Sequence, residues 1–331
     1  DKAERRVQAE QLPALAVIIL GIVVLERFVA GFLKGASAPG YQGLSEQKQA
    51  FWGGIKMKTR VISAIVAIAI LAAVIYLGET AIGIAVFLLA VMALHEFNRA
   101  LEMGGYMPVK AISFAACIPL LYIALSGILP SGAVISGNSV VIAAAVFVFA
   151  LLVSLFCFLM FSDGKYGIKD VSVTLFGIMY IPFLFSFFTL TRQMEAGYLY
   201  IWLILIGACA TDTFAYFTGL AVGRVKIVPK ISPKKTLEGC IGGVAGCIIA
   251  MTVFGACFIN GMDVPLMRFA VLGLICGIIS QLGDWSASAV KRAVGIKDYG
   301  NIMPGHGGVL DRIDSILFTA PAVYFFINLF F

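Results

Sequence analysis

Residues 198–219 of the chain read YLYIWLILIGACATDTFAYFTG, and this stretch decides the fold class. A helix needs roughly 20 predominantly apolar residues to cross the hydrocarbon core of a bilayer. The one carboxylate of the stretch, Asp212, is expensive inside an apolar helix, and such a residue is a candidate for a functional role. We infer that residues 198–219 form a membrane helix that carries a polar group near one end.

Runs of the same kind recur along the whole chain. Hydrophobic residues make up 61% of the sequence and charged residues only 13%, whereas soluble domains carry about 25% charged residues. The apolar runs are Val61–Gly78, Thr80–Phe97, Ile112–Leu129, Ser139–Phe161, Val171–Leu190, Tyr198–Gly219, Gly239–Phe258, Pro265–Gly283 and Val309–Phe331. We therefore predict an all-α, polytopic integral membrane protein with about nine transmembrane helices.

The first 56 residues fit this pattern poorly. Leu12–Leu25 is apolar but short for a span, and residues 35–49 (GASAPGYQGLSEQKQ) have the composition of a flexible linker. We interpret residues 1–56 as an appended segment with a short hydrophobic helix, followed by a membrane-embedded domain at 57–331. A native amphipathic or spanning helix at the N-terminus is the alternative.

Cationic loops alternate along the chain. Lysines and arginines follow the second, fourth, sixth and eighth apolar runs, while the loops between them carry few cations or balanced charge. The positive-inside rule places the cationic loops on the cytoplasmic side of the membrane. The net charge of +6 is therefore explained by cations beside membrane spans, and we expect contact with anionic lipids rather than with nucleic acid.

The densest polar stretch follows the eighth run. It comprises residues 288–292 (SAVKR), 297–300 (KDYG) and 304–314 (PGHGGVLDRID). Cations with flexible glycine backbone suit phosphates, and carboxylates such as Asp284, Asp311 and Asp314 suit a divalent metal. The alternative is that Asp284 marks the water boundary and that the other two aspartates interact with a helix dipole. The pattern predicts phosphoryl chemistry at a membrane surface.

A second polar cluster surrounds the end of the sixth run. It comprises residues 212–219 (DTFAYFTG) and 232–239 (SPKKTLEG). The Ser-Pro-Lys-Lys-Thr turn opens a helix, and free N–H groups at a helix start bind phosphate well. A plain cationic anchor with an N-cap residue is the alternative for the two lysines, and the following glycines also fit close helix packing.

These two clusters resemble the signature of the phosphatidate cytidylyltransferase family, the CDP-diacylglycerol synthases. The likeness covers roughly Met57 to Phe331 and is carried by Ser288–Asp314, Asp212–Gly219 and Ser232–Gly239. It implies a membrane nucleotidyltransferase that condenses CTP with phosphatidic acid to give CDP-diacylglycerol and pyrophosphate. Magnesium is the implied cofactor, with a second, monovalent cation as a further expectation. The catalytic half would span about 198–331.

The polar clusters and the resemblance together suggest roles for individual residues. The expected catalytic residues are Asp284, Asp311, Lys291, Arg292 and Asp314. The expected metal ligands are Asp284, Asp311, Asp314 and Asp212. The expected substrate-binding residues are Ser232, Lys234, Lys235, Thr236, Glu238, Ser288, Lys297, Asp298, His306, Gly307, Gly308, Arg312 and Tyr216.

Several alternatives remain open. A CDP-alcohol phosphotransferase is disfavoured because Ser315 follows Asp314 where that class requires glycine after its second aspartate. A CTP-dependent polyprenol kinase is chemically closer to a cytidylyltransferase, and an anion transporter is a third possibility.

His95 and Glu96 end the second run: we interpret His95 as a helix-end residue and leave the role of Glu96 open. We expect a bacterial inner-membrane protein with a cytoplasmic site; a homodimer is compatible with the sequence but not required by it.

Overall fold

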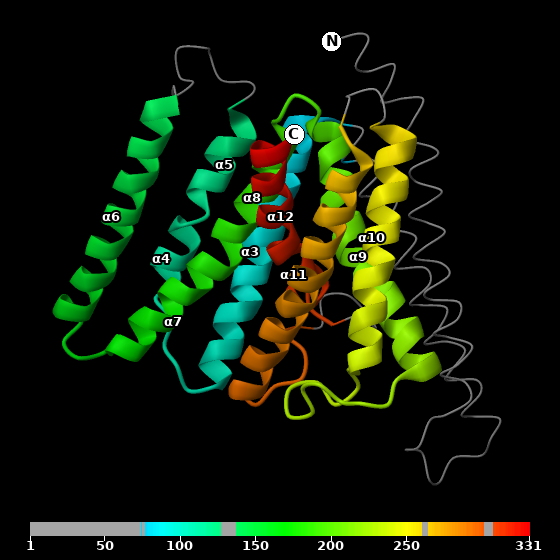
Figure 1. Cartoon of the computed structure of the whole chain (residues 1–331). Coiled ribbons are helices and arrows are strands. Elements are labelled where there is room, and N and C mark those ends of the chain that lie inside the picture. Colours follow the sequence, from blue (N-terminus) through cyan, green and yellow to red (C-terminus); the bar gives the residue numbers. More distant parts are fainter. Residues whose placement is uncertain (1–73, 75–76, 127–136, 260–263, 301–306) are drawn as a thin grey trace.

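The apolar runs form long helices in a computed structural model of the chain, which describes residues 74, 77–126, 137–259, 264–300 and 307–331 (Figure 1). The helices are α3 (Glu79–Met103), α4 (Lys110–Ala115), α5 (Ile118–Leu125), α6 (Gly137–Phe161), α7 (Ile168–Ile178), η2 (Met179–Phe183), α8 (Leu184–Arg192), α9 (Gly197–Val222), α10 (Leu237–Phe258), α11 (Leu266–Ala293) and α12 (Leu310–Phe330). Residues 1–56 and nearly all of the first run, Val61–Gly78, lie outside the described residues.

Within the described part of the chain, six helices are long and apolar enough to cross a membrane. They are Glu79–Met103, Ile168–Arg192, Gly197–Val222, Leu237–Phe258, Leu266–Ala293 and Leu310–Phe330. Large apolar side chains such as Leu88, Ile249 and Phe325 are exposed on these helices, as a lipid-facing surface requires. The predicted class of polytopic helical membrane protein is confirmed, whereas the count of nine spans is not.

Proline affects two of the predicted spans in different ways. The third run divides into α4 and α5, with Pro119 in the first turn of α5. A proline has no N–H to donate and crowds the carbonyl four residues earlier, so the helix is interrupted before it. Pro182 lies in the π-helical turn η2 and does not end its helix, because α7, η2 and α8 run on as one 25-residue span.

Helices α9, α10 and α11 pack closely because small residues line the contacts. A Cβ atom added at Gly243 would lie 2.9 Å from the Thr211 carbonyl oxygen, and one added at Gly273 would lie 2.6 Å from the Ile248 Cα. Backbones can approach this closely only where no side chain stands between them. Gly243 of α10 therefore packs closely against α9, as the sequence allowed for the α10 glycines, and Gly273 of α11 packs closely against α10.

The chain enters and leaves the bundle so that the cationic loops share one end. The connections after α3, α6, α9 and α11 lie at the lower end of Figure 1, and the described end of the chain, Phe331, lies at the opposite end. The alternation of charge along the sequence therefore corresponds to an alternation in space. The polar motifs gather toward this lower end.

Candidate active site

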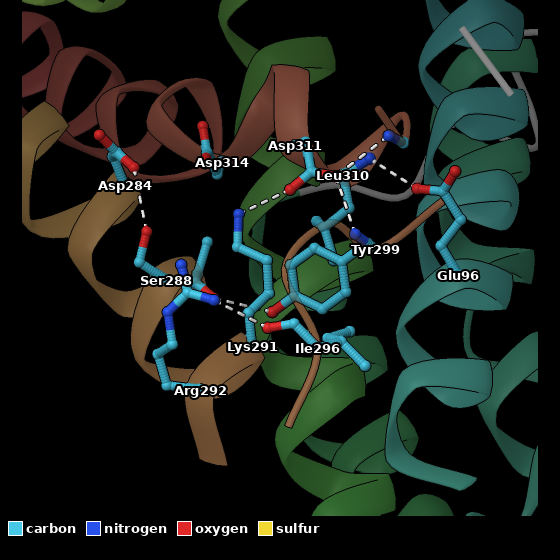
Figure 2. Close-up of polar contacts among 12 residues, drawn as sticks. Glu96, Asp284, Ser288, Lys291, Arg292, Ile296, Tyr299, Leu310, Asp311 and Asp314 are labelled. Carbon is cyan, nitrogen blue, oxygen red and sulfur yellow. Dashed lines mark hydrogen bonds and ion pairs between the residues drawn. The ribbon is translucent and has the colours of Figure 1, made fainter. Parts of the chain in front are cut away.

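The Asp311 carboxylate is the best-connected group of the site (Figure 2). One oxygen, Oδ1, lies 2.6 Å from the Lys291 ammonium, and the side chains of Asp311 and Lys291 are only 4% and 11% exposed. The other oxygen, Oδ2, accepts the backbone N–H groups of Tyr299 and Gly308 at 2.9 and 3.0 Å. A buried charge needs such partners, and here they come from α11, the following loop and the start of α12.

Tyr299 forms one wall beside this ion pair. Its ring centroid lies 5.4 Å from the Lys291 ammonium, close enough for a cation–π contact. Its hydroxyl donates to the Ala287 carbonyl at 3.1 Å. Burial, reinforced by the charge of Asp311, raises the pKa of Tyr299 well above its ordinary value, so the hydroxyl remains a donor. The sequence interpretation did not single out this residue, although it lies within the signature.

Asp284 forms the second ion pair and joins the two polar clusters. Its carboxylate contacts the Lys235 ammonium directly, and the two side chains are 27% and 24% exposed. The Ser288 hydroxyl lies 3.4 Å from the same carboxylate, one turn later on α11. The Lys235 ammonium also lies 5.7 Å from the Trp285 ring centroid. Lys235 thus brings the loop before α10 against α11.

Asp314 and Asp212 lie on neighbouring helices. Asp314 is 8% exposed and accepts the backbone N–H of Ser315 at 2.8 Å. The Ser315 hydroxyl lies 3.5 Å from the Asp212 carboxylate and so connects α12 to α9. Figure 2 shows Asp284, Asp311 and Asp314 along one side of the site.

The donor set can be tested for its fit to magnesium. Among the described residues, no three histidine, cysteine or acidic side chains form a ready-made metal cage. The carboxylates of Asp284 and Asp311 nevertheless each accept a cationic ammonium group, and they are the hard oxygen donors that Mg²⁺ takes. The chemistry of the donors fits the ion, and metal binding stays a prediction.

The loop between α9 and α10 is braced by its own side chains. The Thr236 hydroxyl accepts the Gly239 N–H at 3.2 Å as the N-cap of α10, which confirms the predicted helix start. The Glu238 carboxylate accepts the backbone N–H groups of Arg224 and Val225, so it closes the loop on itself. Ser232 is half-buried, and Lys234 is exposed.

The remaining predicted residues differ in their contacts and exposure. The Arg292 guanidinium donates to the carbonyls of Ile231 and Ile296 at 3.3 and 3.0 Å, so it ties the α9–α10 loop to the end of α11. Lys297, Asp298 and Arg312 are exposed, and Tyr216 is half-buried on α9. Gly307 has a φ of 91°, a conformation that favours glycine. His306 lies outside the described residues.

Glu96 is the site residue that sequence reasoning left undecided. It lies on α3, is 3% exposed, and accepts the backbone N–H groups of Val309 and Leu310 at 3.0 and 2.9 Å. The available signal was a carboxylate close to the end of an apolar run, where a charge without a partner is expensive. Its partner is more than 200 residues away in sequence, so no local pattern could identify it.

Fold and site together define a polytopic helical membrane protein with carboxylate and ammonium groups gathered toward one end of its bundle. A sequence model of the Cytidylyltransferase family matches residues 58–330, and the chain therefore belongs to that family. Residues 1–57 lie outside the match.

The similarity to three curated relatives covers nearly the whole length of each relative. The phosphatidate cytidylyltransferase of Bacillus subtilis (strain 168) is 30% identical over 277 residues, which is 83% of this chain and 99% of that protein. The enzyme of the same name from Staphylococcus haemolyticus is 33% identical over 80% of this chain and 96% of its own. That from Synechocystis is 32% identical over 82% of this chain and 96% of its own.

Proposed function

We propose that this chain condenses CTP with phosphatidic acid, giving CDP-diacylglycerol and pyrophosphate. Its membership of the cytidylyltransferase family and the names of its relatives support this reaction. The structural observation that carries the proposal is the pairing of Lys235 with Asp284 and of Lys291 with Asp311. The Lys235–Asp284 pair joins the loop before α10 to α11, and the Lys291–Asp311 pair joins α11 to α12, so both pairs place a cation against a carboxylate along α11.

The reaction needs charge neutralisation more than it needs a base. The phosphate of phosphatidate is already a nucleophile, and its oxygen attacks the α-phosphorus of CTP. A new P–O bond forms while the bond to the β-phosphate oxygen breaks, and pyrophosphate leaves with that electron pair. Both substrates are anions that repel each other, so a site that aligns them must supply positive charge.

The chain supplies that positive charge from cations that differ in their exposure to solvent. Lys291 is nearly buried beside Asp311, Lys235 is about a quarter exposed, and Lys234, Lys297 and Arg312 are exposed. In our proposal the exposed cations attract the nucleotide, while Lys235 and Lys291 bind phosphate oxygens at the reacting centre. The hydroxyls of Ser232 and Ser288 are further phosphate donors. Arg292 holds the α9–α10 loop in place through the Ile231 carbonyl.

Magnesium would be held by Asp284 and Asp311, with Asp314 and Asp212 completing or orienting the site. When bound, the ion would neutralise charge on the α-phosphate and on the leaving pyrophosphate. A second, monovalent cation would accommodate the carboxylate charge that one Mg²⁺ leaves unbalanced. Lys235 and Lys291 contact the same carboxylates, so the cations proposed to bind phosphate lie beside the residues that would hold the ion.

The cationic loops assign an orientation to this site. They follow α3, α6, α9 and α11 and share one end of the bundle (Figure 1). By the positive-inside rule we place that end in the cytoplasm, where CTP is available, and the helices in the bacterial inner membrane. The lipid substrate would reach the site from the bilayer while the nucleotide arrives from water.

An assay with separately labelled CTP tests the proposal. Purified protein in detergent receives phosphatidate, Mg²⁺ and CTP labelled at either the α- or the γ-phosphate. We expect the α label to enter the lipid and the γ label to leave as pyrophosphate. Entry of the γ label into a lipid would instead show a kinase, and no lipid labelling at all would contradict the proposed transfer.

A further inference from the structure

A carboxylate from α3, a helix distant in sequence, accepts hydrogen bonds from backbone N–H groups at the start of α12. The first N–H groups of an α-helix have no partner within the helix and must be satisfied from outside. Here Glu96 of α3 accepts the N–H groups of Val309, the N-cap residue, and of Leu310, the first residue of α12. Figure 2 shows the Glu96 side chain extending from α3 toward Leu310. A negative charge at this end of a helix also interacts favourably with its dipole.

Two glycines of the signature make room for this carboxylate. A Cβ atom added at Gly300 would lie 2.4 Å from Glu96 Oε1, and one added at Gly308 would lie 2.5 Å from Glu96 Oε2. At Gly300 the three nearest atoms all belong to Glu96. The sequence interpretation assigned Gly308 to phosphate contact, whereas its lack of a side chain has a direct use inside the protein. Gly300 was not assigned any role.

The two backbone N–H groups that Glu96 binds immediately precede Asp311 in the chain. Asp311 follows Leu310 in α12, and its Oδ2 atom accepts the Gly308 N–H, which precedes the two N–H groups bound by Glu96. Glu96 is 3% exposed and so has little freedom to move. Any change that releases Val309 and Leu310 should therefore shift Asp311 relative to Lys291.

We propose that Glu96 is a positioning residue, which fixes the start of α12 and thereby sets the Asp311 carboxylate against Lys291. The residue does not contact substrate in this proposal, and its effect on turnover rests on the cytidylyl transfer proposed above. Its effect on the structure does not depend on that reaction. The two consequences can therefore be measured separately.

The kinetic test combines Glu96 with Gly300. Glu96→Gln retains one acceptor but presents an amide NH₂ to the other backbone donor. A misplacement of about 1 Å at the site costs on the order of 100-fold, so we expect kcat to fall by about that factor. The KM for CTP should change by less than about threefold, because no substrate contact is lost. Glu102→Gln, on the same helix in an exposed pair with Lys110, is the matched control and should retain wild-type kinetics.

The double variant distinguishes positioning from general damage. Gly300→Ala alone should impair turnover, because its methyl group collides with the Glu96 carboxylate. In a Glu96→Ala background the same change should cost less than about twofold, since the obstructing side chain is gone. Independent, multiplicative losses from the two changes would overturn the proposed fit between Glu96 and Gly300.

Hydrogen–deuterium exchange supplies a readout that needs no activity. In wild-type protein we expect the amides of Val309 and Leu310 to exchange slowly, and in Glu96→Ala to exchange at least about tenfold faster. Unchanged exchange in Glu96→Ala would overturn the positioning role even if turnover fell. Faster exchange with a wild-type protein that transfers no cytidylyl group would uphold the contact and reject the proposed function instead.

Discussion

Replacing Lys291 with methionine should destabilise the protein much more than the same replacement of Lys235. Methionine is unbranched and nearly as long as lysine but carries no charge. Asp311 would then retain its bonds from Tyr299 and Gly308 but lose its ammonium partner in a place where its side chain is 4% exposed. Asp284, in contrast, is 27% exposed, and water can replace Lys235.

The expected magnitudes follow from this difference in burial. Removing one partner of a buried ion pair costs about 3 to 5 kcal/mol, and the two retained N–H bonds of Asp311 place Lys291→Met at the lower end, about 3 kcal/mol. Fully exposed pairs contribute about 1 kcal/mol or less, and because the Lys235–Asp284 pair is partly exposed we expect a loss of about 1 kcal/mol for Lys235→Met. The double variant Lys291→Met with Asp311→Asn should be more stable than Lys291→Met alone, because the unpaired charge is gone.

Denaturant titration of the purified protein in detergent micelles measures these changes in the free energy of unfolding. Chelator is present throughout so that no divalent cation replaces the missing ammonium. Equal losses for Lys291→Met and Lys235→Met would refute the reasoning from burial. A double variant less stable than Lys291→Met would show that Asp311 is not the partner whose charge is left unbalanced.

Three further outcomes are expected. Asp284→Asn should lower phosphatidate-dependent turnover by at least about 100-fold while the protein stays folded and membrane-inserted, and wild-type rates would contradict the metal assignment. Removal of divalent cations with EDTA should abolish turnover and added Mg²⁺ should restore it; full activity in EDTA would exclude a magnesium requirement. Gly273→Ala should destabilise the bundle by about 1 to 3 kcal/mol in denaturant titration, because its methyl group would meet the α10 backbone. Leu274→Ala, at a 44% exposed position, should cost less, and equal losses would argue against close α10–α11 packing.

Hydropathy and loop charge predicted much of the fold, because both reflect contact with lipid and water and neither requires knowledge of partners. Among the described residues, the third run departs from the prediction because Pro119 interrupts its helix. Pro182 shows that proline alone does not decide the matter, since the α7–α8 helix passes it through a π-turn. Whether a helix breaks or adapts depends on packing that the sequence does not display.

The sequence predicted most of the residues of the site but not which of them contact one another. Sequence reasoning identified Asp284, Asp311, Lys235 and Lys291, but not how they pair. The Lys235–Asp284 pair joins residues 49 apart, and the Lys291–Asp311 pair joins residues 20 apart on α11 and α12. Glu96 meets its partners across 213 and 214 residues. Its carboxylate within an apolar helix indicated that it needed a partner, and only the assembled bundle identifies which one.

The most direct test of the central claim is phosphatidate-dependent release of pyrophosphate from CTP by the purified protein reconstituted in lipid vesicles. We expect pyrophosphate release in equal amount to the CDP-diacylglycerol formed, and none when phosphatidate is omitted. Release of CDP instead, or CTP turnover that is indifferent to phosphatidate, would contradict cytidylyl transfer to the lipid.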